Sequence, residues 1–105
     1  MIEARGCDAA SLRSLEALQS LCARIVRELD LHVVGEPQWH RFPGEAGVTG
    51  MLLLAESHLT CHTFPEHRLA TLNLYCCRPR PPWPWRERLR EALGAHDVSE
   101  RVVER

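Results

Sequence analysis

The sequence predicts an α+β fold: a two-layer α/β sandwich in which a mainly antiparallel sheet carries two helices on one face. Apolar residues recur at helical spacing over residues 11–29, and apolar and polar residues alternate over 68–77. The elements follow the order strand, helix, several strands, helix, strand. A chain of 105 residues is long enough for one core, so we expect a single domain over residues 1–105.

The first part of the chain is predicted to hold one long helix between two extended segments. Residues 1–7 are expected to form a short first strand, and residues 32–42 a second extended segment. The helix over 11–29 has Asp8 or Ser11 as its N-cap. Its apolar face consists of Leu12, Leu15, Leu18, Cys22, Ile25, Val26 and Leu29.

The middle of the chain is predicted to supply further strands. Residues 43–47, Pro-Gly-Glu-Ala-Gly, form a turn. The run Met51–Ala55 is wholly apolar and bounded by turns, which predicts a buried strand. In the strand over 68–77 the two faces are expected to carry Ala70, Leu72, Leu74 and Cys76 on one side and Thr71, Asn73, Tyr75 and Cys77 on the other.

The last part of the chain begins with a proline-rich segment. Residues 78–84 are expected to form a stiff, extended connection. A second helix over 85–93 follows and ends at Gly94. Residues 98–103 are expected to form the final strand.

Composition excludes several classes of function. A net charge of −1 and a pI near 6.6 provide no basic field for nucleic acid. The longest apolar run, Met51–Ala55, is too short to span a bilayer, so we expect no membrane contact. Five cysteines without a secretion signal favour reduced thiols and a cytoplasmic protein. No Cys-x-x-Cys motif occurs, and no metal site is expected.

The absence of lysine restricts the chemistry further. All 13 basic residues are Arg, which excludes any enzyme that holds a cofactor or substrate through a lysine imine, pyridoxal-phosphate enzymes included. A protein of this composition that handles amines through an imine needs a carbonyl from another source.

The dipeptide Glu56-Ser57 can supply such a carbonyl. A serine hydroxyl can attack the carbonyl carbon of the preceding residue and convert the amide to an ester, if a nearby group manages the protons. Elimination from the ester cleaves the chain and leaves dehydroalanine, whose hydrolysis produces a pyruvoyl ketone.

The surrounding residues resemble a known family. The stretch GVTGMLLLAESHLTCHTFPEHRLATLNLYCC resembles the centre of the short prokaryotic S-adenosylmethionine decarboxylases, which are pyruvoyl-dependent proenzymes. That family shows Ser/Thr-Gly, an apolar strand, Glu-Ser-His, His-Thr-aromatic-Pro-Glu and a downstream Cys. The second His lies five residues after Ser57, and Cys77 lies twenty after it.

The resemblance implies a role for each matching residue. Cleavage at Glu56–Ser57 would produce a β chain of residues 1–56 and an α chain of residues 57–105 that begins with pyruvoyl. Ser57, His62 and Cys77 would be catalytic: His62 would move protons during processing, and Cys77 would protonate the substrate's α-carbon after carbon dioxide leaves. The implied supporting residues are Thr49 for processing, Glu66 for the ribose hydroxyls, and Phe64 and Phe42 for the adenine or the sulfonium.

The resemblance also implies a homodimer, a small-molecule substrate and a place in polyamine (spermidine) biosynthesis, without metal or diffusible cofactor. This chain departs from the family pattern at Asn73 and at Tyr75-Cys76-Cys77-Arg78, where Asp and aromatic-Thr-Cys-Gly are usual. Two alternatives therefore stay open. One is a pyruvoyl-dependent decarboxylase of another amino acid, such as arginine or ornithine. The other is a non-enzymatic paralogue that is never cleaved and acts as a dimer partner.

Overall fold

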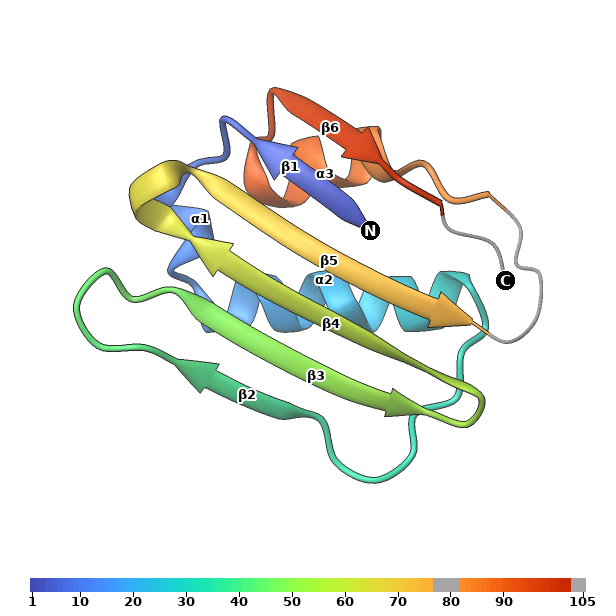
Figure 1. Ribbon diagram of the computed structural model, residues 1–105. Helices are drawn as coiled ribbons and strands as arrows, with labels where there is room; N and C mark the ends of the chain where they lie inside the picture. Colours follow the sequence, from blue (N-terminus) through green and yellow to red (C-terminus); the bar gives the residue numbers. More distant parts are fainter. Residues whose placement is uncertain (77–81, 103–105) are drawn as a thin grey trace.

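The computed structural model, which describes residues 1–76 and 82–102, contains one six-stranded antiparallel sheet (Figure 1). Its strands are β1 (Ile2–Arg5), β2 (Gln38–Arg41), β3 (Val48–Leu54), β4 (Ser57–Phe64), β5 (Leu69–Cys76) and β6 (Asp97–Glu100). Their spatial order is β2-β3-β4-β5-β1-β6, so β4 lies inside the sheet and β2 at one edge.

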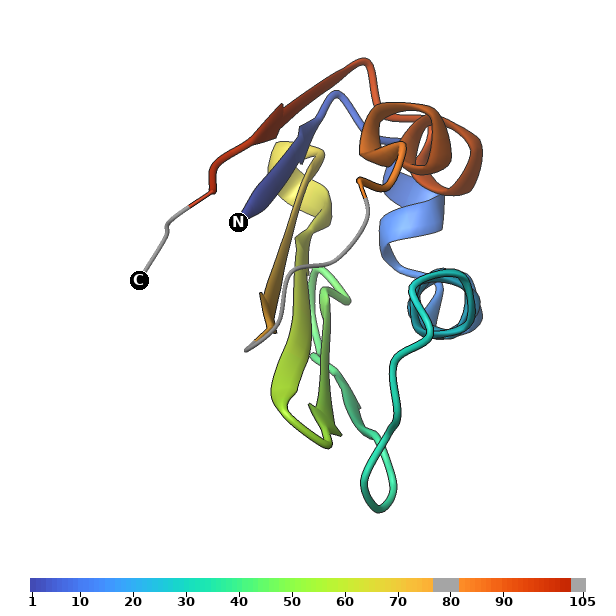
Figure 2. The same cartoon turned by 90° about the vertical axis from the view of Figure 1, so that its right-hand side faces the viewer.

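The helices cover one face of this sheet and leave the other face open (Figure 2). They are α1 (Ala9–Leu12), α2 (Leu15–Glu28) and α3 (Trp85–Leu93), with a short 3-10 helix η1 (Pro65–His67) between β4 and β5. The two-layer α+β sandwich predicted from the sequence is therefore confirmed. Within the described residues, none of the helices has the length and apolar character needed to cross a membrane.

The prediction of one continuous helix over residues 11–29 is wrong. The chain forms two helices there, because Arg13 ends α1 and Ser14 starts α2. The Ser14 hydroxyl accepts a hydrogen bond from the Ala17 amide at 3.1 Å, which is the N-cap that the periodicity alone does not reveal. The helix predicted over 85–93 is confirmed, and it ends at Gly94 with a φ of 68°.

The strand predicted at Met51–Ala55 exists, but the prediction that it is buried is wrong. Strand β3 alternates: Leu52 and Leu54 are buried against the helices, while Met51 and Leu53 are 54% and 59% exposed. The sheet has helices on one face only, so every second side chain of β3 points to the open face. The alternation predicted over 68–77 is confirmed for β5, whose buried residues are Ala70 and Leu72.

Edge strand β2 packs against its neighbour β3 through a close contact of the Trp39 indole ring. Trp39 lies directly opposite Gly50 of β3, and a Cβ at Gly50 would overlap the indole ring. Glycine at this position therefore lets Trp39 pack against the core from the edge strand.

Thr63 is the buried polar side chain of the described core, with 2% of its surface exposed. Its hydroxyl donates to the Leu12 carbonyl and accepts from the Val48 amide, both at 2.8 Å. The hydroxyl thus links β4 to β3 and to the end of α1. Both backbone groups would lose this buried partner if the hydroxyl were removed.

We expect Thr63→Val to lower the free energy of unfolding by about 2–4 kcal/mol, because a buried amide and a buried carbonyl lose their hydrogen bonds. Thr60→Val is the matched control, since Thr60 lies three positions away on the same strand, half-buried and facing the open side. Urea denaturation of both variants measures the difference. Equal stability of the two variants would contradict this role of Thr63.

Candidate active site

The proposed cleavage bond lies at one end of the sheet. Ala55 and Glu56 form the two-residue turn between β3 and β4, and Ser57 is the first residue of β4. Ser57 is half-buried and lies opposite Leu54 on β3 and Cys76 on β5. Residues paired in this way share a face of the sheet. Because Leu54 is buried on the helix side, the Ser57 side chain lies on that side too.

His62 and Thr49 lie on the open face of the sheet. They are directly opposite one another on β4 and β3, and the Thr49 hydroxyl is hydrogen-bonded to His62 Nδ1. The Thr71 hydroxyl on β5 donates to the His62 backbone carbonyl at 3.5 Å. These neighbours fix the position of His62, and the bond at Nδ1 leaves Nε2 as the nitrogen available for proton transfer.

Four rings surround this hydrogen bond, and we refer to His40, Phe42, His62 and Phe64 as the ring cluster. The centroid of Phe42 lies 4.4 Å from that of His40 and 6.0 Å from that of His62. Phe64 lies 4.4 Å from His62. The rings meet edge to face, which is a favourable arrangement for aromatic pairs. Phe42 remains 42% exposed, so the ring cluster offers aromatic surface to a ligand.

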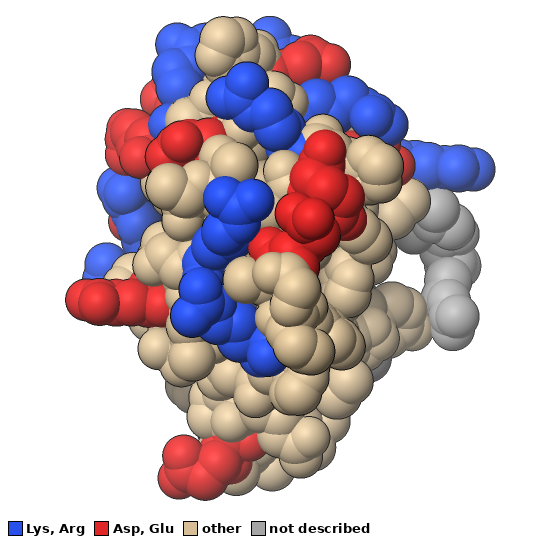
Figure 3. Space-filling view, turned by 90° about the vertical axis from the view of Figure 1, so that its left-hand side faces the viewer, with Lys and Arg blue, Asp and Glu red and all other residues tan. Residues whose placement is uncertain are grey.

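Glu66 lies just past the ring cluster. It is an exposed residue of η1, which follows β4 directly. This end of the sheet is opposite to the end that carries Ser57, as the arrowheads of β2 and β4 and the β3–β4 turn show (Figure 1). Acidic and basic side chains are intermixed over this end, without an extended field of either sign (Figure 3).

The predicted site residues therefore fall into two groups within one chain. Glu56 and Ser57 lie at one end of β4, whereas His62, Thr49, Phe64, Phe42 and Glu66 lie toward the other end. Five residues along a strand separate Ser57 from His62, about 17 Å at about 3.4 Å per residue, and the odd spacing places them on opposite faces. A single chain does not bring His62 to Ser57.

The predicted proton donor Cys77 lies outside the described residues, as does Arg78. The preceding residue, Cys76, is half-buried and directly opposite Ser57. The described end of β5 thus reaches the cleavage site. Asn73, one of the departures from the family pattern, is exposed on the open face opposite Thr60.

Two other cysteines belong to the core. A hydrogen bond with the Cys61 thiol, together with burial, raises the pKa of the Cys22 thiol far above its ordinary value. Cys22 therefore stays protonated at neutral pH and behaves as a small apolar group. No cluster of metal-ligating side chains is found among the described residues.

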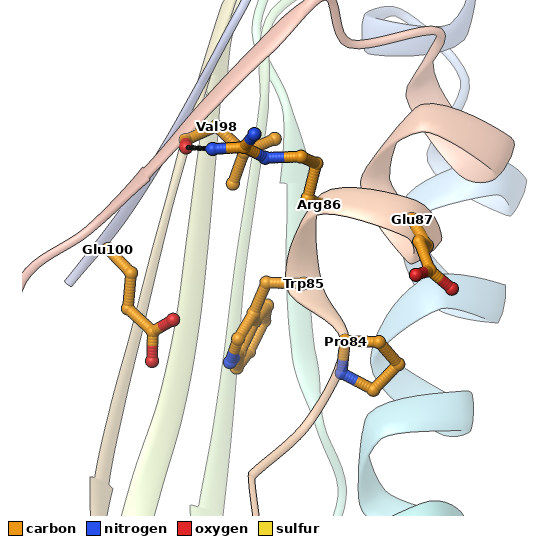
Figure 4. Close-up of a pocket in the computed structure, with 6 residues that line it drawn as sticks. All are labelled: Pro84, Trp85, Arg86, Glu87, Val98 and Glu100. Carbon is orange, nitrogen blue, oxygen red and sulfur yellow. Dashed lines mark hydrogen bonds between the residues drawn. The ribbon is translucent and has the colours of Figure 1, made fainter.

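Two hollows in the described surface lie away from these residues. One, of about 290 Å³, opens between the start of α3 and β6 (Figure 4). It is lined by Pro84, Trp85, Arg86, Glu87, Val98 and Glu100. A second, of about 470 Å³, lies between α2 and the edge formed by β2 and β3. Neither is lined by a residue that the sequence predicts for the site.

One residue of the ring cluster has no role predicted from the sequence. His40 lies on β2, directly opposite Thr49, and so extends the row of Thr49 and His62 to the edge of the sheet. It lies 22 positions before His62 in the chain. Only the strand register brings the two histidines into the same row.

Comparisons with known proteins identify the family of this chain. The family described as S-adenosylmethionine decarboxylase matches residues 1–105. An S-adenosylmethionine decarboxylase proenzyme of Anoxybacillus flavithermus is 33% identical over 90 residues, covering 86% of this chain and 71% of the relative. That of Bacillus velezensis is 31% identical over 97 residues, covering 92% and 75%.

A third relative, the S-adenosylmethionine decarboxylase proenzyme of Aquifex aeolicus, is 38% identical over 72 residues, covering 69% of this chain and 52% of the relative. The match to the family covers the full sequence, including both groups of site residues and the strands that carry them. The chain belongs to the S-adenosylmethionine decarboxylase family.

Proposed function

We propose that this chain is a proenzyme that cleaves itself between Glu56 and Ser57 and then decarboxylates S-adenosylmethionine. The observation that carries the proposal is the hydrogen bond between the Thr49 hydroxyl and the His62 ring. These two residues are 13 positions apart in sequence, and the resemblance assigns both of them to processing. Their contact supports a shared role in proton transfer.

The proposed cleavage needs only side chains that this sequence contains. The Ser57 oxygen attacks the Glu56 carbonyl carbon, the amide C–N bond breaks, and the proton of the hydroxyl passes to the leaving amine. A base then removes the α-hydrogen of residue 57, and the ester oxygen leaves with Glu56 as a carboxylate, which leaves dehydroalanine at position 57. Water then hydrolyses its imine tautomer, so that the nitrogen leaves as ammonia and a ketone remains at the α-carbon. Nε2 of His62 is the proposed proton carrier, because Nδ1 is held by Thr49.

The residues present fit a pyruvoyl group at position 57. Ser57 is a half-buried strand residue that follows a two-residue turn. Cleavage there would leave a free chain end at the start of β4. A pyruvoyl group there would supply a ketone able to condense with the substrate amine and to accept the electron pair released with carbon dioxide. Cys77 is the proposed donor of the proton to the substrate, on the strength of the resemblance.

Substrate binding is proposed for the residues beyond His62. Phe42 and Phe64 would contact the adenine or the sulfonium, since aromatic faces attract cations and stack on bases. The Glu66 carboxylate would accept hydrogen bonds from the ribose hydroxyls. The reaction belongs to polyamine biosynthesis, and we place the enzyme in the cytoplasm.

We further propose that the active enzyme is a homodimer with sites shared between chains. Within one chain, Ser57 and His62 lie about 17 Å apart on opposite faces. The open face carries exposed apolar side chains, namely Phe42, Met51, Leu53 and Tyr75. A two-fold axis between two open faces would bury this surface. If the axis runs perpendicular to the strands, it would also lay the β3–β4 turn and the Glu56–Ser57 bond of one chain over the His62 end of its partner.

Mixed dimers test this arrangement. We expect Ser57→Ala and His62→Ala chains to remain uncleaved when each is produced alone, because each lacks one half of the processing site. When both are co-expressed, the mixed dimer holds one intact site, and the His62→Ala chain should be cleaved in roughly half of its copies by random pairing. A size tag on one chain and denaturing gel electrophoresis identify the cleaved species.

Two outcomes separate the possibilities. If the His62→Ala chain is cleaved in the mixture while the Ser57→Ala chain stays intact, the site is shared between chains. A mixture in which both chains stay intact, under conditions where the unmutated protein is cleaved, contradicts it and assigns processing to residues of one chain. Carbon dioxide release from S-adenosylmethionine, compared with arginine and ornithine, then establishes the substrate of the cleaved protein.

A further inference from the structure

His40 is the part of the ring cluster that the processing chemistry does not use. Its ring meets Phe42 edge to face, with an interplanar angle of 83°, and it lies opposite Thr49 on the open face. It is an exposed side chain on the edge strand β2. Strand register and ring contact together place it beside Phe42, one of the two phenylalanines proposed for substrate binding.

The ring nitrogens of His40 are available to a ligand. No hydrogen bond or ion pair joins them to another residue in the described ranges 1–76 and 82–102. His62 differs in this respect, because its Nδ1 is bonded to Thr49. A neutral imidazole carries one hydrogen-bond donor and one acceptor, so His40 can form two directed bonds where His62 has one free nitrogen.

The aromatic rings near His40 indicate which part of a ligand its hydrogen bonds would recognise. Phe42 and Phe64 offer ring surface but no hydrogen-bonding group, so they can hold a flat base without distinguishing one purine from another. Specific recognition of a base requires polar groups at its edge. The ring centroids of His40 and Phe42 lie 4.4 Å apart, so the imidazole adjoins the ring on which a base would stack.

We propose that His40 binds the edge of the substrate's purine base and makes the site selective for an adenosyl group. This inference rests on the proposed function, because it takes the ring cluster as the nucleoside-binding surface. It assigns His40 to substrate binding and leaves self-cleavage to His62 and Thr49. Replacing His40 is therefore expected to change the affinity for substrate, with little effect on self-cleavage or on the rate at which bound substrate is decarboxylated.

The test replaces the imidazole with a ring of similar shape. In the cleaved enzyme, His40→Phe is expected to raise KM for S-adenosylmethionine about tenfold, the effect of about 1.4 kcal/mol, and to leave kcat within about twofold. His40→Gln, which keeps a donor and an acceptor, should recover part of the affinity. His32→Phe, an exposed histidine outside the ring cluster, is the matched control and should behave as the unmutated protein.

A binding measurement makes the result independent of cleavage. The probe is 5′-methylthioadenosine, which lacks the amine and carboxylate and so needs no ketone, and calorimetry with Ser57→Ala protein measures its Kd. His40→Phe in that background should weaken binding about tenfold, and the preference for 5′-methylthioadenosine over 5′-methylthioinosine should fall toward one. A purely structural role for His40 would weaken both probes equally.

The outcomes keep the two proposals apart. If KM, Kd and the preference between the probes are unchanged within about twofold in His40→Phe, the assignment of His40 is wrong even when cleavage and decarboxylation proceed. If the unmutated protein binds 5′-methylthioadenosine with the expected dependence on His40 but never cleaves, the binding inference stands and the proposed function fails.

Discussion

Ser57→Ala is expected to produce a chain that remains at full length and releases no carbon dioxide from S-adenosylmethionine. The hydroxyl oxygen of Ser57 is the proposed nucleophile, and the same residue becomes the ketone. Its loss therefore removes both the cleavage reaction and the electrophile. No side chain can substitute, because the sequence contains no lysine to form an imine with the substrate or a cofactor. Activity should fall below detection, since the ketone can form only after the Ser57 oxygen has attacked the Glu56 carbonyl carbon.

Ser99→Ala is the matched control for this variant. Ser99 is an exposed serine in β6, so its replacement should leave cleavage and turnover unchanged. Denaturing electrophoresis and mass determination after prolonged incubation distinguish the two variants. Fragments ending at Glu56 in the Ser57→Ala protein would mean that another group performs the attack.

Loss of the His62 imidazole is expected to slow self-cleavage by about 100-fold or more, the usual contribution of a positioned acid–base group. Thr49→Val should slow it by roughly tenfold, because the ring stays in place by packing but loses its partner at Nδ1. The readout is the rate at which full-length protein disappears after synthesis, followed by gel electrophoresis over hours.

Thr49→Ser separates the hydroxyl from the shape of the side chain. This variant keeps the hydroxyl and should cleave nearly as fast as the unmutated protein. His67→Ala is a further control, because His67 lies in η1, outside the ring cluster. Thr49→Val cleaving as fast as Thr49→Ser would show that the bond to His62 has no part in processing.

The fold was predictable from the sequence in segments where functional side chains do not interrupt the apolar periodicity. The alternation over 68–77 matches β5, and the helical spacing over 11–29 matches α2, although the chain forms a separate α1 before it. Strand β4 has the same alternation, with Leu59, Cys61 and Thr63 on the buried side. Reactive side chains on its other side obscure the pattern, so the sequence did not delimit this strand. The apolar run in β3 suggested burial because sequence does not reveal which face lacks a covering layer.

The candidate site was predictable as a set of residues but not as an arrangement. The motif indicated Ser57 and His62 as partners five positions apart. In a strand, that odd spacing separates them onto opposite faces, which follows only once β4 is recognised. His40 could not be predicted, because its place beside Phe42 and Thr49 depends on the register of β2 against β3.

The mass of freshly purified and incubated protein, measured after denaturation, tests the central claim most directly. Cleavage between Glu56 and Ser57 predicts two pieces, residues 1–56 and residues 57–105, the second resistant to amino-terminal sequencing and reactive toward a carbonyl reagent such as a hydrazide. A single species of full-length mass that persists through incubation and fails to react with the hydrazide would contradict the claim.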